Sequence, residues 1–71
     1  LTGQGKDFLQ KAIPYAEKAM NAFEVGFKKT EKSRYKSAVN LLENIYQSLG
    51  DKDNLKIYSD KYNAADEKFV N

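Results

Sequence analysis

The clearest pattern in the sequence is a pair of amphipathic helices joined by a tight turn, within residues 35–62. Apolar residues recur there every three or four positions, the spacing that places them on one face of an α-helix. In the first helix they are Tyr35, Ala38, Val39, Leu42, Ile45, Tyr46 and Leu49. In the second they are Leu55, Tyr58 and Tyr62, and Ala65 and Phe69 continue the same spacing beyond residue 62. The pattern predicts a helical hairpin, because a short turn makes the two helices run antiparallel.

Gly50 and Asp51 mark the turn between these two helices. Glycine adopts a positive φ without steric cost, so Gly50 is suited to end the first helix. Asp51 can cap the free amides of the next helix, and Asp53 in the first turn suits the helix dipole. These signals predict helices over about 31–49 and about 52–69.

A third apolar stripe precedes the hairpin and predicts a helix over about 7–27. It consists of Leu9, Ala12, Ile13, Ala16, Ala19, Met20 and Phe23. Asp7 with Gln10 resembles a capping box at its start, and Gly26 can end it. Pro14 removes one backbone hydrogen bond inside the stripe. Either the helix kinks near Gln10 or its regular part starts around Ile13, and we expect one kinked helix because the stripe stays in phase across the proline.

The chain is therefore predicted to be all-α, a single domain of residues 1–71 with three antiparallel helices. No linker divides it. Thr30 is expected to cap the second helix, with Glu31 in its first turn. A chain of this length buries only about 60% of its unfolded surface, so the core leaves a small stability margin. Because the sequence begins at Leu1 without a methionine, we expect it to be a fragment of a longer protein.

The composition argues against catalysis. Histidine and cysteine are absent, which removes the commonest general base, the thiol nucleophile and the main soft metal ligands. Acidic pairs such as Asp51 with Asp53 and Asp66 with Glu67 fall at predicted helix ends, where capping and solvation explain them. The sequence has no calcium-binding loop and no glycine-rich phosphate loop. We predict a protein that is not an enzyme and that uses no cofactor and no metal.

Charge and hydropathy bear on whether the chain binds DNA or crosses a membrane. The net charge is +2 although 31% of the residues are charged, which argues against non-specific DNA binding as the main task. No run of about 18 apolar residues is present, so no transmembrane segment is predicted. The sequence leaves the compartment open between cytoplasm and periplasm.

An uncharged polar stripe runs along the predicted middle helix, beside its apolar face. Its members are Ser37, Asn40, Asn44, Gln47 and Ser48. Side chains that donate and accept hydrogen bonds without carrying charge are unexpected on a purely solvated face of so highly charged a chain. We expect this stripe to contact a partner, and the alternative is a solvated helix face.

Basic residues gather in the connection between the first two helices and in the start of the second. They are Lys28, Lys29, Lys32, Arg34 and Lys36, against Glu31 alone. Such a cluster can bind a phosphate backbone, an anionic lipid head group or an acidic protein. Its alternative is a solvated loop. Few aromatic residues accompany it, which weakens a role in binding single-stranded nucleic acid.

The hairpin resembles a tetratricopeptide repeat, whose two helices span about 34 residues. When the family pattern is aligned on IYQSLGD, Val39 takes the tryptophan place, Leu42 the leucine and Tyr46 the tyrosine. The Gly-Asp pair of the turn also matches the family. Upstream, KAIPYAEKAM is similar to the second helix of a preceding repeat, with Ala12 and Ala19 at the two small-residue places.

This resemblance implies an antiparallel three-helix array, made of the second helix of one repeat and a helical hairpin. The chain is similar to the C-terminal end of many bacterial tetratricopeptide proteins. The resemblance implies a protein–protein interaction or scaffold module that binds a peptide, a partner protein or neighbouring repeats of the same chain in a helical groove. In that family the first helix of each repeat lines the groove, which points to Asn40 and Asn44.

Two other functions stay open on the sequence alone. One is a small three-helix domain that binds nucleic acid or an anionic surface through residues 28–36. The other is a structural element that completes a larger host domain. Tyr15 lies off the main stripe of the first helix, and we expect it to face a neighbouring repeat or a partner.

Overall fold

A computed structural model describes residues 3–69 and contains three α-helices, with no strand in that range. α1 covers Gly3–Glu24, α2 covers Lys32–Leu49 and α3 covers Lys52–Lys68. Two 3₁₀ turns, Val25–Phe27 and Lys29–Glu31, connect α1 to α2. The predicted all-α fold of three helices is confirmed.

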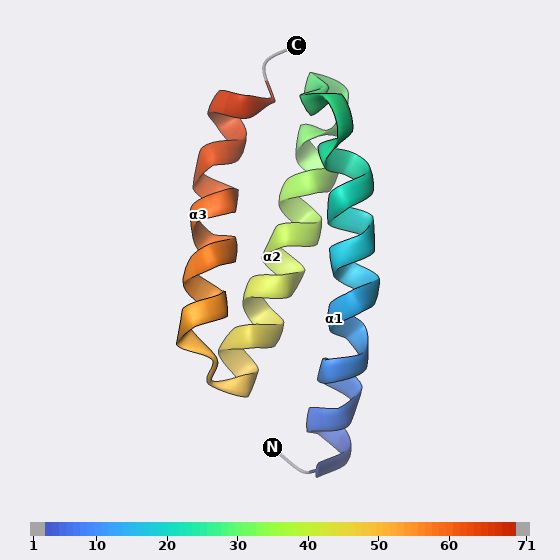
Figure 1. The fold of residues 1–71 in the computed structure, drawn as a ribbon, viewed down its shortest axis with the longest axis vertical. Helices are drawn as coiled ribbons and strands as arrows, with labels where there is room; N and C mark the ends of the chain where they lie inside the picture. Colours follow the sequence, from blue (N-terminus) through green and yellow to red (C-terminus); the bar gives the residue numbers. More distant parts are fainter. Residues whose placement is uncertain (1–2, 70–71) are drawn as a thin grey trace.

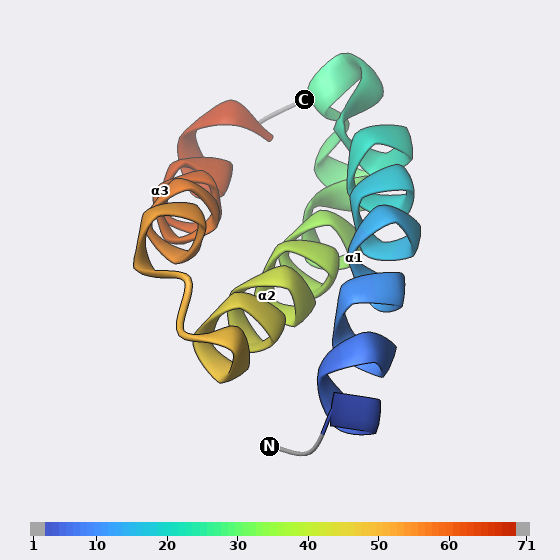
Figure 2. The same cartoon turned by 60° about the horizontal axis from the view of Figure 1, so that its bottom comes forward.

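The three helices lie side by side with α2 in the middle, and consecutive helices run antiparallel (Figure 1). The view in Figure 2 shows α1 and α3 flanking α2. α2 packs against both neighbours, whereas α1 and α3 come close to each other at few places. The molecule is elongated, with extents of 43 × 19 × 13 Å. The fold is therefore organised by the middle helix.

The core lies on the side of α2 that faces the other two helices. Its largest fully buried side chains are Val39, Leu42 and Phe69. The other buried apolar residues are Ala16, Met20, Tyr35, Ala38, Ile45, Tyr46, Tyr58 and Ala65. Leu49, Leu55 and Tyr62 are partly buried and pack against this core. The predicted core of the hairpin is thus confirmed, with its periphery less deeply buried than its centre.

Aromatic rings close the end of the molecule where α1 leads into α2. The Phe69 ring lies 4.6 Å from the Tyr35 ring and 5.3 Å from the Phe27 ring, the latter edge-on. Gly26 takes the expected positive φ of 76° within the Val25–Phe27 turn that follows α1. Aromatic pairs of this kind contribute about 0.5–1.5 kcal/mol beyond their buried area. They join the connection after α1, the start of α2 and the residue after α3.

α1 is held to the hairpin by a hydrogen bond as well as by apolar packing. The Tyr58 hydroxyl donates to Glu17 Oε1 at 3.0 Å, and its ring stacks on Tyr46 with 5.5 Å between ring centres. α1 continues as one helix through Pro14, as expected. Pro14 and Gln10 are both exposed, so water can satisfy the carbonyl that proline leaves without a helical donor.

The turn between α2 and α3 has the geometry that its sequence predicts. Gly50 adopts a left-handed conformation with φ 74°. Its N–H donates to the Gln47 carbonyl at 3.1 Å, and the Asp51 N–H donates to the Tyr46 carbonyl at 3.0 Å, the two bonds of a Schellman motif. Asp51 accepts hydrogen bonds from the Asn54 backbone and side chain at 3.2 and 2.7 Å, which lower the pKa of its carboxyl.

Two predicted caps are wrong. α1 is already helical at its first described residue, so Asp7 lies inside the helix and forms no capping box. Thr30 does not cap α2, which starts at Lys32 without a side-chain cap. Thr30 instead lies within the Lys29–Glu31 turn, where the Glu31 N–H donates to the Lys28 carbonyl at 2.9 Å and the Lys32 N–H donates to the Lys29 carbonyl. This tight turn satisfies groups that a capping side chain would otherwise serve.

Leu42→Ala should lower the free energy of unfolding by about 2–5 kcal/mol, because the side chain is fully buried and leaves a cavity. Leu41→Ala is the matched control. Leu41 is 46% exposed and should cost much less. Urea denaturation followed by circular dichroism measures both variants. Equal unfolding midpoints for Leu42→Ala and Leu41→Ala would contradict the buried position of Leu42.

The buried tyrosines predict a loss of stability in alkali. Burial, helped by the negative charge of Glu24, raises the pKa of Tyr35 to about 12. Burial also raises the pKa of Tyr58, which bonds to Glu17, and of Tyr46. A phenol with a raised folded pKa stabilises the fold fully below the unfolded pKa of about 10, and the contribution disappears as pH rises through the folded value.

We therefore expect the melting temperature to fall between about pH 10 and 12. Ultraviolet absorbance should show phenolate appearing together with loss of helical signal. Tyr58→Phe keeps the ring and removes one titrating group, so its stability should fall less steeply over this range. Complete ionisation of all tyrosines near pH 10 with the helical signal intact would refute this expectation.

Candidate functional site: the open face of α2

The side of α2 opposite the core is open to solvent and carries the uncharged stripe. Ser37, Asn40, Asn44, Gln47 and Ser48 are all exposed. We call this surface the open face of α2. None of the five side chains makes a hydrogen bond to another residue within residues 3–69. Their donors and acceptors are thus free to contact a partner.

A groove of about 340 Å³ separates α1 from α2 along one side of the open face. Its lining residues are Tyr15, Ala16, Ala19 and Phe23 of α1 and Ser33, Arg34, Ser37, Ala38 and Leu41 of α2. We call it the α1/α2 groove. Tyr15 is 80% exposed and Leu41 is 46% exposed. Tyr15 is therefore exposed at the groove, and the expectation that it faces a neighbouring repeat or a partner stays a prediction.

A second hollow, of about 330 Å³, lies between α2 and α3 on the other side of the open face. Its lining is polar and consists of Lys32, Ser33, Lys36, Ser37, Asn40 and Tyr62. Ser33 and Ser37 belong to both hollows. The open face of α2 is therefore a ridge with an apolar groove on one side and a polar hollow on the other.

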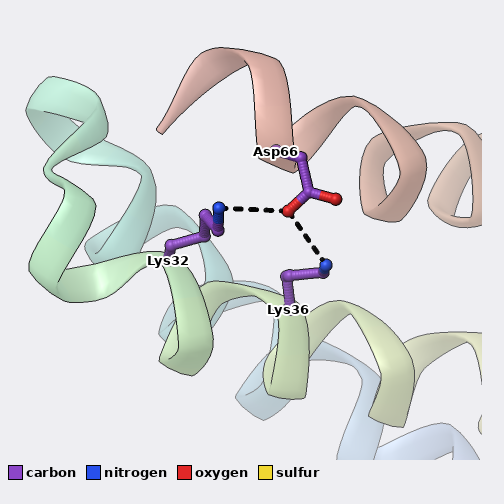
Figure 3. A network of polar contacts seen from close by, with 3 residues as sticks. All are labelled: Lys32, Lys36 and Asp66. Atoms are coloured by element: carbon purple, nitrogen blue, oxygen red, sulfur yellow. Dashed lines mark hydrogen bonds and ion pairs between the residues drawn. The ribbon is translucent and has the colours of Figure 1, made fainter. Parts of the chain in front are cut away.

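We call residues 28–36 the basic segment. Two of its five basic side chains make contacts that join α2 to α3, and the other three do not. Lys32 and Lys36 both contact Asp66 Oδ1 of α3, at 3.1 and 3.2 Å (Figure 3). Lys36 also lies 4.8 Å from the centre of the Tyr62 ring. Two of the five predicted anion-binding residues thus hold α2 to α3, and one carboxylate partly offsets their charge.

The other three basic residues remain at the surface. Arg34 makes a long contact of 3.8 Å with Glu31 and its side chain is 69% exposed. Lys28 and Lys29 are exposed and form no ion pair within the described chain. The structure therefore does not gather all five basic side chains at one place.

Asp66 was not identified from the sequence as the partner of the two lysines, because thirty residues separate it from Lys36. The groove residues Phe23 and Leu41 were not identified either. One signal was present, since Tyr15 and Leu41 are large apolar residues outside the core stripes of their helices. Such residues indicate a contact surface rather than a core.

The site is suited to binding through hydrogen bonds and apolar contacts. Among residues 3–69 no cluster of acidic side chains has an arrangement that could hold a metal ion. No helix in that same range is long and apolar enough to cross a membrane. Comparisons with protein-family models, with curated proteins and with solved structures found no match for this chain.

Asp66 predicts a contribution to stability that depends on pH. Hydrogen bonds from Lys32 and Lys36, with their positive charges, lower the pKa of its carboxyl. A carboxylate with a depressed folded pKa stabilises the fold above the unfolded pKa of about 4, and the contribution is lost as pH falls through the folded value.

Asp66→Asn should therefore melt at a lower temperature than the wild type at neutral pH, and the difference should vanish in acid. The effect should be small, because exposed ion pairs contribute little. Glu67→Gln changes an exposed neighbour that makes no ion pair in the described chain, and it serves as the control. Identical melting curves for Asp66→Asn and wild type at every pH would show that the two lysines do not depend on this carboxylate.

Proposed function

We propose that this chain is a protein-interaction or scaffold module that binds a peptide or a partner protein along the open face of α2, without catalysis. The observation that supports it most is the set of exposed uncharged side chains without partners in the described chain. An asparagine amide offers a donor and an acceptor that match a peptide bond. Covering an amide costs less than covering a charged side chain, so a partner can bury it.

The resemblance to tetratricopeptide repeats gives this proposal a second line of support. In this view α1 is the second helix of one repeat, and α2 with α3 forms the next. α2 then takes the place of the helix that lines the binding groove in that family, and neighbouring repeats of the same chain are further possible partners. Asn40 and Asn44 are the residues that we propose to hold a partner backbone.

Binding of nucleic acid or an anionic surface through residues 28–36 has less support. The contacts of Lys32 and Lys36 with Asp66 leave a smaller free charge than the sequence suggests. A surface that binds phosphates usually concentrates its basic side chains on one face.

The proposal predicts that Asn44 contributes to affinity and not to stability. Peptides selected from a random library on the wild-type chain should bind Asn44→Ala more weakly by about 1–3 kcal/mol, because a buried peptide group loses its partner. Isothermal titration calorimetry measures the change. The helical content and melting temperature should hardly change, since alanine is the better helix former.

Asn63→Ala is the matched control for this experiment. Asn63 is exposed like Asn44 but lies on α3, so its replacement should leave affinity unchanged. If neither Asn44→Ala nor Asn40→Ala weakens any selected peptide, the open face of α2 is only a solvated surface.

A further inference from the structure

The outer surface of α1 next to the α1/α2 groove combines apolar side chains with free lysines. Phe8 is 73% exposed and Tyr15 is 80% exposed. They lie seven residues apart in the sequence and therefore on the same face of the helix. Lys11 and Lys18 are neighbours of Tyr15 on that face, four residues before it and three after it. Both lysines are exposed, and neither forms an ion pair within residues 3–69.

The shape of the groove suits a helix. Ala16 and Ala38 are buried and Ala19 is half-buried, so small side chains form its bottom. The more exposed Tyr15 and Leu41 form its rims. Small residues allow another helix to approach to the usual interaxial distance of about 8–10 Å. An amphipathic helix placed there would bury its apolar face, a common mode of peptide recognition.

Basic side chains outnumber acidic side chains around the groove. Among the described residues that line the groove, Arg34 is the only charged one, and the two lysines of α1 lie beside the groove. The acidic residues Glu17 and Glu24 of α1 are turned toward tyrosines of the hairpin instead. Two carboxylates lie near these basic residues: Asp7, one helical turn before Lys11 on α1, and Glu31, which contacts Arg34 at 3.8 Å. The three basic side chains outnumber them, so the surroundings of the groove are basic on balance and complement an acidic partner.

We propose that the α1/α2 groove binds an acidic amphipathic helix of a separate partner protein. Apolar side chains of that helix enter between Tyr15 and Leu41, and its carboxylates pair with Lys11, Lys18 and Arg34. This inference rests on the proposed interaction function and names the chemistry of the partner. It gives the partner a second contact surface beside the open face of α2.

A second copy of this chain is a poorer occupant of the groove. In a symmetric dimer each partner presents the same surface to the other. Pairing through the groove would bring the surface of one copy that carries Lys11, Lys18 and Arg34 against the same basic surface of the other. Like charges at an interface oppose association.

The test uses a designed helical peptide with leucine at every third or fourth position and glutamate elsewhere. A matched peptide carries lysine in place of each glutamate. Fluorescence anisotropy with the 71-residue chain should show that the acidic peptide binds at least about tenfold more tightly than the basic one at low salt. The difference should shrink in high salt, because salt screens exposed charges.

Variants locate the peptide on the chain. Tyr15→Ala and Lys18→Glu should each weaken the acidic peptide by about tenfold, with unchanged melting curves because both side chains are exposed. The matched controls lie on α3. Ile57→Ala removes a side chain that is 50% exposed, and Lys52→Glu reverses an exposed charge. Neither control should change the affinity.

The possible outcomes separate this inference from the proposed function. Equal binding of the two peptides, or no binding of either, overturns the inference. A peptide weakened by Asn44→Ala and not by Tyr15→Ala lies on the open face of α2, which overturns the inference and leaves the proposed function intact. A dimer in sedimentation that Tyr15→Ala abolishes identifies a second copy as the occupant, and this also overturns the inference. Loss of affinity in Tyr15→Ala and Lys18→Glu, with unchanged affinity in the two α3 controls, supports the inference.

Discussion

The packing of one apolar side of α2 against both other helices is the interaction on which the structure depends. Val39 and Leu42 are fully excluded from solvent there. α1 and α3 make few direct contacts with each other that could substitute for this packing. A domain of this size has a stability margin of only a few kcal/mol. Each helix that packs on α2 covers part of its circumference, and the remaining part forms the open face. The site is therefore a consequence of the same packing that builds the core.

Contacts between residues far apart in the sequence complete the arrangement. Tyr58 of α3 reaches across to Glu17 of α1, forty-one residues earlier, and Asp66 holds two lysines of α2. Hydrogen bonds and ion pairs of this kind add less energy than the core, and each of them joins two helices. Asp66 also changes the interpretation of the basic segment, because two of its lysines have a structural partner.

The two surfaces beside each other on α1 and α2 differ in chemistry. The open face of α2 is neutral and offers hydrogen bonds, whereas the α1/α2 groove is apolar with basic surroundings. Hydrogen bonds to a peptide backbone depend weakly on salt, and charge pairs at a surface depend strongly on it. A partner that uses both surfaces would combine general recognition of a peptide with selection by charge. Ser37 lines the hollows on both sides of the open face of α2, so it would contact such a partner on either surface.

The sequence by itself determined the three helices, the turn at Gly50 and the centre of the core around Leu42. These features follow from helical periodicity and from the φ that glycine permits, which are local properties. Only the tertiary structure decided that Asp66 pairs with the lysines and that α1 and α2 enclose a groove. A 3₁₀ turn, rather than the expected Thr30 cap, also precedes α2 in the structure. These features depend on which distant side chains meet, and helical periodicity alone carries no information about the distances between separate helices.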